Sequence, residues 1–411
     1  MTEYADSGAE GRLTAYFDRI GDVLGGAERR ASFATYAMGL LGEGERKSVE
    51  PMVARACLAP GRMDAAHQRL LHFTVDSPWS DRAVRREAAK YALEAMTARE
   101  PVEAWILDDT GFLKQGTHSV GVHRQYTGSA GKVTNCQVAT SLTIATRTDQ
   151  VPIDFALYLP KAWTDDPARR AEARIPWHVD FATKPELGLE LLRSALAAGV
   201  PPGLVLADQA YGASGDLRDG IRALGLHYAV AVDAKTVVRV YDKSGRLRDE
   251  TLRVKKLAGR IEANGGFRRC TWRQGTKQPL SARFALRRVV WAGKARRGQP
   301  PVDEREPVWL LIEWRDGESE PANYFFCSLA QRMTRKKLVR LVMQRWRTER
   351  AYQDLKGELG LDHYEGRRFP GWHHHVSVVL ACYAFVVAER ARFFSLPTRR
   401  TMGHHAHSFA A

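Results

Sequence analysis

Apolar side chains recur at helical spacing through the first hundred residues of the chain. Tyr16, Ile20 and Leu24 stand four positions apart, so they share one face of a helix. Further along, Ser80 stands before a run of helix-forming residues, a position at which a hydroxyl caps a helix start. The pattern predicts a helical N-terminal domain over residues 1–100.

From Trp105 onward the helical spacing gives way to short apolar runs that are typical of buried strands. Two such runs end at Asp108 and Asp208, and between them two β-branched stretches joined by RTDQ predict a hairpin. An amphipathic stretch that closes on Gly199 predicts a helix. The order of strand, hairpin, helix, strand, helix and strand predicts a mixed sheet covered by helices over 101–232, and hence an α/β (mixed α+β) fold class.

Strand-like alternation continues through residues 233–333, and this β-rich segment is strongly basic. Within 251–300 a single acid, Glu262, opposes many lysines and arginines, and Trp272 and Trp291 are interleaved with them. A basic β surface with aromatic rings suits phosphate contacts combined with base stacking. A solvated basic face is the alternative interpretation of the same pattern.

The remaining residues, 334–411, are predicted to be helical. One continuous helix is expected from Thr334 to about Gly357 or Gly360. The longest apolar run, 376–388, is shorter than the ~20 residues that a membrane-spanning helix needs. We therefore expect a buried helix there, and no contact of the protein with a membrane.

The overall charge and the cysteines narrow the range of partners and locations. Lys and Arg total 62 against 47 Asp and Glu, which gives a formal net charge of +15. Such an excess favours polyanionic partners, because each phosphate that Lys or Arg neutralises releases condensed counterions; a merely basic protein is the alternative. The cysteines are scattered and the N-terminus has no secretory pattern, so we expect a reducing, cytoplasmic location and neither a disulfide framework nor a structural zinc site.

Two aspartates stand where apolar strands end. If the strands ending at Asp108 and Asp208 are parallel neighbours, ~4.8 Å separates them and their carboxylates can share a metal ion. Two divalent ions often perform phosphodiester chemistry, and oxygen ligands suit Mg²⁺. Asp109 competes for the first position, but Asp108 is preferred because it directly ends the apolar strand, whereas Asp109 enters the turn. Each acid alone is also compatible with capping a turn.

The predicted last helix supplies a third acid. Arg345, Glu349, Tyr352 and Lys356 fall on one stripe of this helix, so one carboxylate is bracketed by two cations. Glu349 would complete the metal site, while Arg345 and Lys356 would hold DNA phosphates. A solvated Glu349 that pairs with Arg345 is the alternative.

Three stretches together resemble a known family. They are DDTGFLKQGTHSVGVHRQYTGSAGKVTNCQV, LVLADQAYG and RWRTERAYQDLKGELGLDHYEGRRFPGWHHH. In this order they resemble the DDE transposases of bacterial insertion sequences, specifically the branch with a β-rich insertion between the second Asp and the Glu. The resemblance covers about 100–380.

The resemblance implies a division of the chain. A ribonuclease-H-like catalytic core would comprise 101–232 as its first part and 334–411 as its C-terminal helical part and tail. Residues 233–333 would be the basic β-rich insertion, and the helical domain at 1–100 would bind DNA.

The same resemblance implies the catalytic residues. Asp108, Asp208 and Glu349 would be the catalytic acids and would hold two Mg²⁺ ions, with Mn²⁺ able to substitute. The branch also carries a Tyr-x2-Arg-x3-Glu-x6-Lys signature. Here Arg345, Glu349 and Lys356 fit its spacing, but Val342 stands at the tyrosine position. Any step that depends on the tyrosine, such as forming a DNA hairpin, is left open.

The activity implied is metal-dependent cleavage of the ends of an insertion sequence, followed by transfer of the 3′-hydroxyl strand to target DNA. The partners would be double-stranded DNA, as element ends and target, and a second copy of the chain in a homodimer synapsed on DNA in the nucleoid. The expected DNA-binding residues are Lys114, Arg124, Arg345, Lys356, Trp272 and Trp291. A non-mobile ribonuclease-H-like DNA endonuclease and a catalytically inactive DNA-binding regulator are the alternatives.

Overall fold

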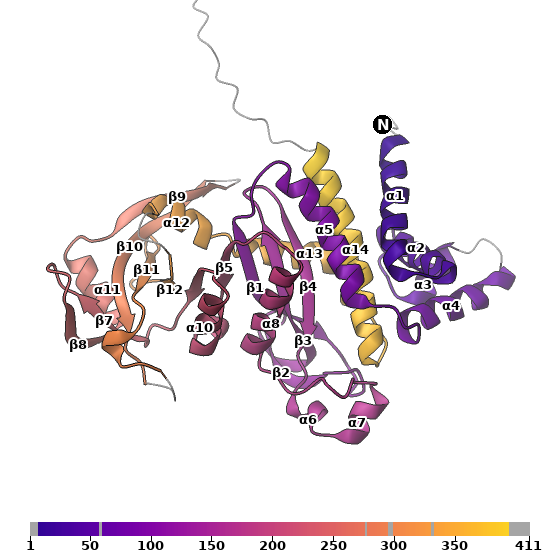
Figure 1. Ribbon diagram of the computed structural model, residues 1–411, viewed down its shortest axis with the longest axis horizontal. Helices are drawn as coiled ribbons and strands as arrows, with labels where there is room; N and C mark the ends of the chain where they lie inside the picture. The colour runs from indigo at the N-terminus through magenta and orange to yellow at the C-terminus, as the bar shows by residue number, and fades with distance from the viewer. Residues whose placement is uncertain (1–6, 57–59, 276–277, 295–298, 330–332, 394–411) are drawn as a thin grey trace, which may run out of the picture.

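The computed structural model describes residues 7–56, 60–275, 278–294, 299–329 and 333–393 (Figure 1). Some residues that the sequence pattern singled out lie outside these ranges: Cys57, Lys277, Arg296 and Arg297.

The N-terminal part is helical, which confirms the helical spacing in the sequence. Its α-helices are α1 (Ser7–Leu24), α2 (Ala27–Leu41), α3 (Val49–Ala56), α4 (Met63–Val75) and α5 (Asp81–Thr97), with a short 3-10 turn at Pro60–Arg62. As predicted, Ser80 caps α5, and its hydroxyl accepts a hydrogen bond from the backbone N–H of Ala83. Helix α5 packs along the long C-terminal helix α14 (Phe369–Phe393) in the middle of the molecule (Figure 1).

A large mixed sheet forms the rest of the fold, so the fold class is mixed α/β. Its strands are β1 (Ala104–Leu113), β2 (His123–Thr127), β3 (Lys132–Ala145), β4 (Gln150–Leu157), β5 (Leu204–Ala207), β6 (Tyr228–Ala231), β7 (Val237–Tyr241), β8 (Leu247–Arg253), β9 (Arg268–Gln274), β10 (Pro279–Trp291), β11 (Val308–Trp314) and β12 (Asn323–Cys327). The order is β2-β3-β1-β5-β6-β12-β11-β10-β7-β8, with β4 beside β3 and β9 beside β10. The predicted hairpin is confirmed, since β3 and β4 pair antiparallel.

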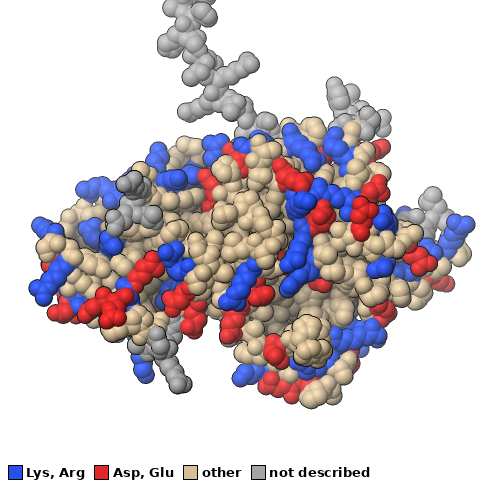
Figure 2. Space-filling model, in the orientation of Figure 1, with Lys and Arg blue, Asp and Glu red and all other residues tan. Residues whose placement is uncertain are grey.

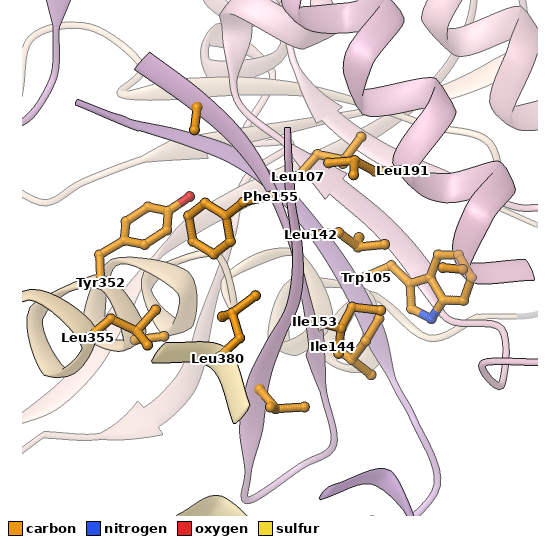
Figure 3. Packing of buried hydrophobic residues seen from close by; sticks show 14 of the residues in the cluster. Trp105, Leu107, Leu142, Ile144, Ile153, Phe155, Leu191, Tyr352, Leu355 and Leu380 are labelled. Carbon is orange, nitrogen blue, oxygen red and sulfur yellow. The ribbon is translucent and has the colours of Figure 1, made fainter. Parts of the chain in front are cut away.

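Helices cover both faces of the β1–β3–β4 part of the sheet. Helix α8 (Lys184–Ala197) packs on one face, while α13 (Trp346–Gly357) and α14 pack on the other. Figure 3 shows Tyr352, Leu355 and Leu380 on one side of the strands and Trp105 and Leu191 on the other. The remaining helices are α6 (Lys161–Thr164), α7 (Pro167–Glu172), α9 (Gln209–Gly212), α10 (Gly215–Ala223), α11 (Val254–Ala263) and α12 (Arg335–Val342), with a 3-10 turn at Val302–Glu304.

The β-rich segment continues the same sheet. Strand β12 pairs antiparallel with β6, so backbone hydrogen bonds join the two parts of the sheet without a break. Strands β7, β10 and β11 follow the predicted strand-like runs, whereas β8, β9, β12 and helix α11 were not predicted. Leu257, Ala258 and Ile261 stand at helical spacing and are buried, which is why this stretch is a helix.

The predicted single helix from Thr334 is wrong, because the structure has two helices. Thr334 caps α12, whose end at Val342 is followed by a turn, and α13 starts with Arg345 as its N-cap. At the turn, the side chain of Gln344 donates a hydrogen bond to Glu103, which holds the chain against the start of β1. Within the described ranges, no helix combines the length and the apolar character needed to cross a membrane.

Candidate carboxylate site

Asp108 and Asp208 lie beside each other where two parallel strands stop pairing. Strands β1 and β5 run parallel, and their last paired residues are Leu107 and Ala207. Asp108 and Asp208 are the next residue on each chain. The prediction that Asp108 ends its strand is wrong, however, because β3 keeps pairing with β1 as far as Leu113. The pairing of β1 with β5 ends just before Asp108, because β5 is the shorter strand. Beyond this point β1 continues with β3 as its partner, and its other edge is no longer paired with β5.

Asp208 is held by the start of a short helix. Its Oδ1 accepts hydrogen bonds from the backbone N–H groups of Ala210 (2.9 Å) and Tyr211 (3.2 Å), so it is the N-cap of α9. The capping interaction fixes the carboxyl group next to the end of β5.

Asp108 is buried, with 8% of its surface exposed. Its Oδ1 accepts from the backbone N–H of Asp109 at 2.8 Å, and its Oδ2 lies 3.3 Å from Nη2 of Arg345. Burial raises the pKa of Asp108 to about 6, although the Arg345 guanidinium opposes the rise, and the nearby Asp208 adds to it. The ionised form of Asp108 is therefore destabilised, because Arg345 does not fully compensate for burial and for the charge of Asp208.

Asp109 belongs to the other face of the sheet. Successive side chains of a strand point to opposite faces, so Asp109 points away from α13 and toward α8. There its Oδ2 lies 2.8 Å from Nζ of Lys184, the first residue of α8. This ion pair gives Asp109 a partner of its own.

Glu349 and Asp108 lie near the same guanidinium group. Nη2 of Arg345 is 3.3 Å from Asp108 Oδ2 and 3.8 Å from Glu349 Oε1. The Glu349 side chain is 62% exposed in the first turn of α13. Across the described ranges, no three His, Cys, Asp or Glu side chains gather closely enough to hold a metal ion. The structure thus brings Asp108 and Asp208 together, and Arg345 contacts both Asp108 and Glu349.

Two polar contacts fix α13 against the sheet. The hydroxyl groups of Tyr352 and Ser141 are 2.6 Å apart, and those of Thr348 and Thr143 are 2.7 Å apart; all four residues are buried. Tyr352 therefore turns inward from the stripe it was expected to share with Glu349. Sequence analysis missed the roles of Thr348, Ser141 and Thr143, although polar residues two apart in β3 place hydroxyls on one face of the strand.

Val342 stands at the position where the transposase branch that the sequence resembles has a tyrosine. Val342 is 3% exposed and packs in the apolar layer between α12 and the sheet, with Leu338 and Ile106. This position offers no hydroxyl to a phosphate.

Two lysines that were expected to contact DNA are held by backbone oxygens. Nζ of Lys356 donates to the backbone oxygen of Gly111 at 2.6 Å, and Nζ of Lys114 donates to that of Tyr364, also at 2.6 Å. Burial lowers the pKa of both lysines. Arg124 is exposed on β2.

The two tryptophans of the basic segment are half-buried and lie elsewhere. The Trp272 ring packs edge-on against Phe284, 5.7 Å between centroids. The Trp291 ring lies 4.8 Å from the guanidinium carbon of Arg305 and 5.5 Å from that of Arg218. These contacts do not connect either ring with Asp108 or Asp208.

Part of the positive charge of the β-rich segment is paired locally. The ion pairs include Lys255–Glu320, Arg260–Glu250, Arg269–Asp316 and Arg283–Glu262. On the face shown in Figure 2, basic and acidic side chains are accordingly interspersed over the β-rich part at the left.

Two family models match the chain. The model described as DDE superfamily endonuclease matches residues 19–279, and the model described as Transposase DDE domain matches residues 183–385. The first match contains Asp108 and Asp208, and the second contains Asp208 and Glu349.

Individual proteins are also similar to the chain. A probable transposase for insertion sequence element IS701 from Microchaete diplosiphon is 30% identical over 174 residues, which is 42% of this chain and 42% of that protein. The chain thus spans about two fifths of the length of this curated relative. Among solved structures, the piggyBac transposase synaptic complex with hairpin DNA aligns with a TM-score of 0.45 and 9% identity, covering 89% of this chain and 66% of that one.

Proposed function

This chain belongs to the DDE superfamily of endonucleases, and on that premise we propose that it is the transposase of an insertion sequence. It would cleave the DNA ends of the element and transfer the freed 3′-hydroxyl strand to target DNA. The match to the transposase DDE domain and the 30% identity to a probable insertion-sequence transposase support this assignment.

The observation that carries the proposal is the pairing of Asp108 with Asp208. Two carboxylates from neighbouring parallel strands, one of them buried and short of positive charge, form a site that attracts cations. We further propose that the strands around them form a ribonuclease-H-like core, made of 101–232 and 334–411. Residues 233–333 would be its insertion, and 1–100 a DNA-binding domain.

Members of the DDE superfamily generally use divalent metal ions, and the residues present fit such ions. Asp108 and Asp208 supply hard oxygen donors, and Mg²⁺ is commonly held by one or two carboxylates together with substrate phosphates. When bound, two Mg²⁺ ions, or Mn²⁺ in their place, would supply activation of the attacking oxygen and stabilisation of the leaving one. Glu349 is the third acid that we assign to the site.

The side chains around the acids have positional roles. The N-cap contact holds Asp208 in place, and the backbone N–H of Asp109 orients Asp108. Arg345 partly offsets the charge of Asp108, and its displacement toward a DNA phosphate would let Glu349 approach. Asp108 is assigned rather than Asp109, because Asp109 already has Lys184 as its partner.

The DNA-binding residues are proposed to lie around this edge and on the β-rich part. Double-stranded DNA would be the partner, both as element ends and as target, and a homodimer would hold two ends. The residues assigned are Lys114, Arg124, Arg345, Lys356, Trp272 and Trp291.

The experiment that tests the function is incubation of the purified protein with the ends of its own element and Mg²⁺, followed by mapping of the products. Cleaved ends joined to a second DNA molecule are expected. Cleavage without joining would favour the non-mobile endonuclease, and binding without cleavage would favour the inactive regulator. Glu349→Gln should bind the ends but not cleave them, whereas Glu358→Gln, on the same stretch of chain beyond α13, should cleave normally.

A further inference from the structure

A cavity of about 700 Å³ lies beside the amino end of strand β1, whereas the carboxylate site lies further along the same strand. It is open to solvent and is lined by residues from the C-terminal ends of α5 and α14, the β3–β4 turn, strand β9 and the junction of α12 with α13. In Figure 1 these helix ends point to the top of the view, with β9 and α12 to their left. The register places the β3–β4 turn beside Ala104, and Asp108 is four residues further, about 13 Å along β1 at ~3.3 Å per residue. The cavity is therefore separate from the carboxylate site.

The wall of this cavity is dominated by arginines. Four of them pair with carboxylates: Arg147 with Glu100, Arg340 with Glu103, Arg350 with Asp354 and Arg390 with Asp149. For Arg99, Arg273 and Arg347, the described part of the chain offers no carboxylate at ion-pair distance. Arg99 donates to the backbone oxygen of Ala391 instead. The lining thus holds more cationic groups than carboxylates can neutralise.

Arg347 is the buried one of the three arginines that have no carboxylate partner within the described ranges. It is 8% exposed, and Nη1 donates to Oε1 of Gln150 at 3.1 Å, while Nη2 donates to the backbone oxygen of Arg147. Both partners are neutral, and burial lowers the pKa of Arg347 to about 10. Nε of Arg347 and Nη2 of Arg390, both buried, find no hydrogen-bond partner among the described residues. Both atoms are closed off from solvent, so an anion in the cavity would meet the positive charge of these guanidinium groups and the exposed side chains of Arg99 and Arg273, and not these two donors.

Aromatic rings border the cavity beside its arginines. The guanidinium carbon of Arg273 lies 3.7 Å from the centroid of the Trp346 ring, and Trp272 also lines the cavity. Stacking on Trp346 holds the exposed Arg273 side chain at the edge of the cavity. A basic groove bordered by aromatic rings is the combination that accommodates a nucleic-acid backbone and its bases.

We propose that this cavity binds the phosphodiester backbone of a DNA segment that lies outside the carboxylate site. The proposal rests on the proposed function for the identity of the anion as DNA, but it requires no cleavage. DNA held here would enter along α13, which carries Glu349 toward one site and Trp346 and Arg347 toward the other.

The test uses exposed arginines, so that the fold is preserved. The full-length double variant Arg99→Ala/Arg273→Ala is compared with Arg46→Ala/Arg193→Ala, which removes the same charge at positions outside the cavity. Binding of a duplex DNA of arbitrary sequence is measured against salt concentration, without metal. The slope of log K against log salt should fall by ~0.9 for each phosphate that the cavity variant no longer neutralises, and the slope of the control pair should stay at the wild-type value.

An equal slope in the two double variants would overturn the proposal. A second arm identifies the source of the phosphate: wild type and cavity variant are titrated with inorganic pyrophosphate at constant ionic strength. Loss of pyrophosphate binding together with an unchanged DNA slope would assign the cavity to a small anion instead. Because neither arm measures cleavage, failure here is distinguishable from failure of the transposase assignment, which the product mapping tests.

Discussion

The regions beside the two ends of β1 carry opposite charges. Toward its carboxyl end, Asp108 lies beside Asp208 and contacts the guanidinium of Arg345. Beside its amino end, Arg347 and its neighbours outnumber the carboxylates around them. In both places burial makes the unbalanced charge costly, so each site gains stability from a ligand of the opposite sign. One strand would thus place the proposed cation site near one of its ends and the proposed anion site beside the other.

The largest effect is expected where the acids are removed. Asp108→Asn and Asp208→Asn should each abolish Mg²⁺-dependent end cleavage, a loss beyond the ~100-fold typical of removing an outer-shell partner of a metal ligand. DNA binding should persist in both variants, because the proposed DNA contacts lie on other residues. The measurement is the rate of end cleavage at saturating DNA, with binding followed separately.

Asp109→Asn is the matched control, since Asp109 faces α8 and not α13. It should retain most of the cleavage rate. If Asp109→Asn were inactive and Asp108→Asn active, Asp109 would be the catalytic acid, and the assignment of Asp108 would be wrong.

A second effect concerns stability without metal. Burial raises the pKa of folded Asp108 to about 6 from its ordinary 3.8, so the folded state binds the proton more tightly than the unfolded state does. The group therefore costs stability as pH rises from about 4 to 6, and the cost is complete above pH 6. At pH 8 and without metal, Asp108→Asn should be more stable than wild type by up to about 3 kcal/mol. Near pH 4 this gain should disappear.

Chemical unfolding at the two pH values measures this difference. Addition of Mg²⁺ should stabilise the wild type and leave Asp108→Asn unchanged. A variant that is less stable than wild type at pH 8 would show that Arg345 balances the Asp108 charge completely.

A third, smaller effect concerns the helix shared by the two sites. Tyr352→Phe leaves the buried Ser141 hydroxyl without its partner and should cost about 1–2 kcal/mol of unfolding free energy. Because α13 carries residues of both sites, end cleavage and the salt slope of DNA binding should weaken together. Tyr126→Phe is the control, since that ring is 61% exposed. A change in one site alone would mean that the two sites are positioned independently.

The smallest effect is expected at Asp109, whose charge is already paired with Lys184. Lys184→Met removes the partner of Asp109 and should cost about 1 kcal/mol or less, because this ion pair is partly exposed. End cleavage should stay near the wild-type rate. A large loss of cleavage would show that Asp109 contributes to the carboxylate site, and would weaken the contrast drawn between balanced and unbalanced charges.

Sequence pattern was sufficient to predict the elements that carry the two aspartates. Short apolar runs that end in acids predicted β1 and β5, and their parallel pairing places Asp108 next to Asp208. The extension of β1 to Leu113 was not predicted, because it depends on pairing with β3 and not on the hydrophobicity of β1 itself. The break between α12 and α13 was missed for a similar reason, since Gln344 is fixed by Glu103, far away in the sequence.

The arginine-lined cavity could not be predicted from the sequence. Arg99, Arg147, Arg273 and Arg347 come from segments far apart in the chain, and each alone is an ordinary basic residue. The segment 251–300 is strongly basic in composition, yet part of its charge is neutralised by local ion pairs. Composition reports how many charges a segment has, but pairing in three dimensions decides which of them remain available.

The junction of β6 with β12 has a consequence for anyone who wishes to shorten this protein. Removing residues 233–333 would take away β12 and leave β6 as a bare edge strand of small and apolar residues, Tyr228–Ala231. Such an edge invites pairing with other chains, so a truncated protein should precipitate. A miniaturised version would need a replacement strand or charged residues along β6.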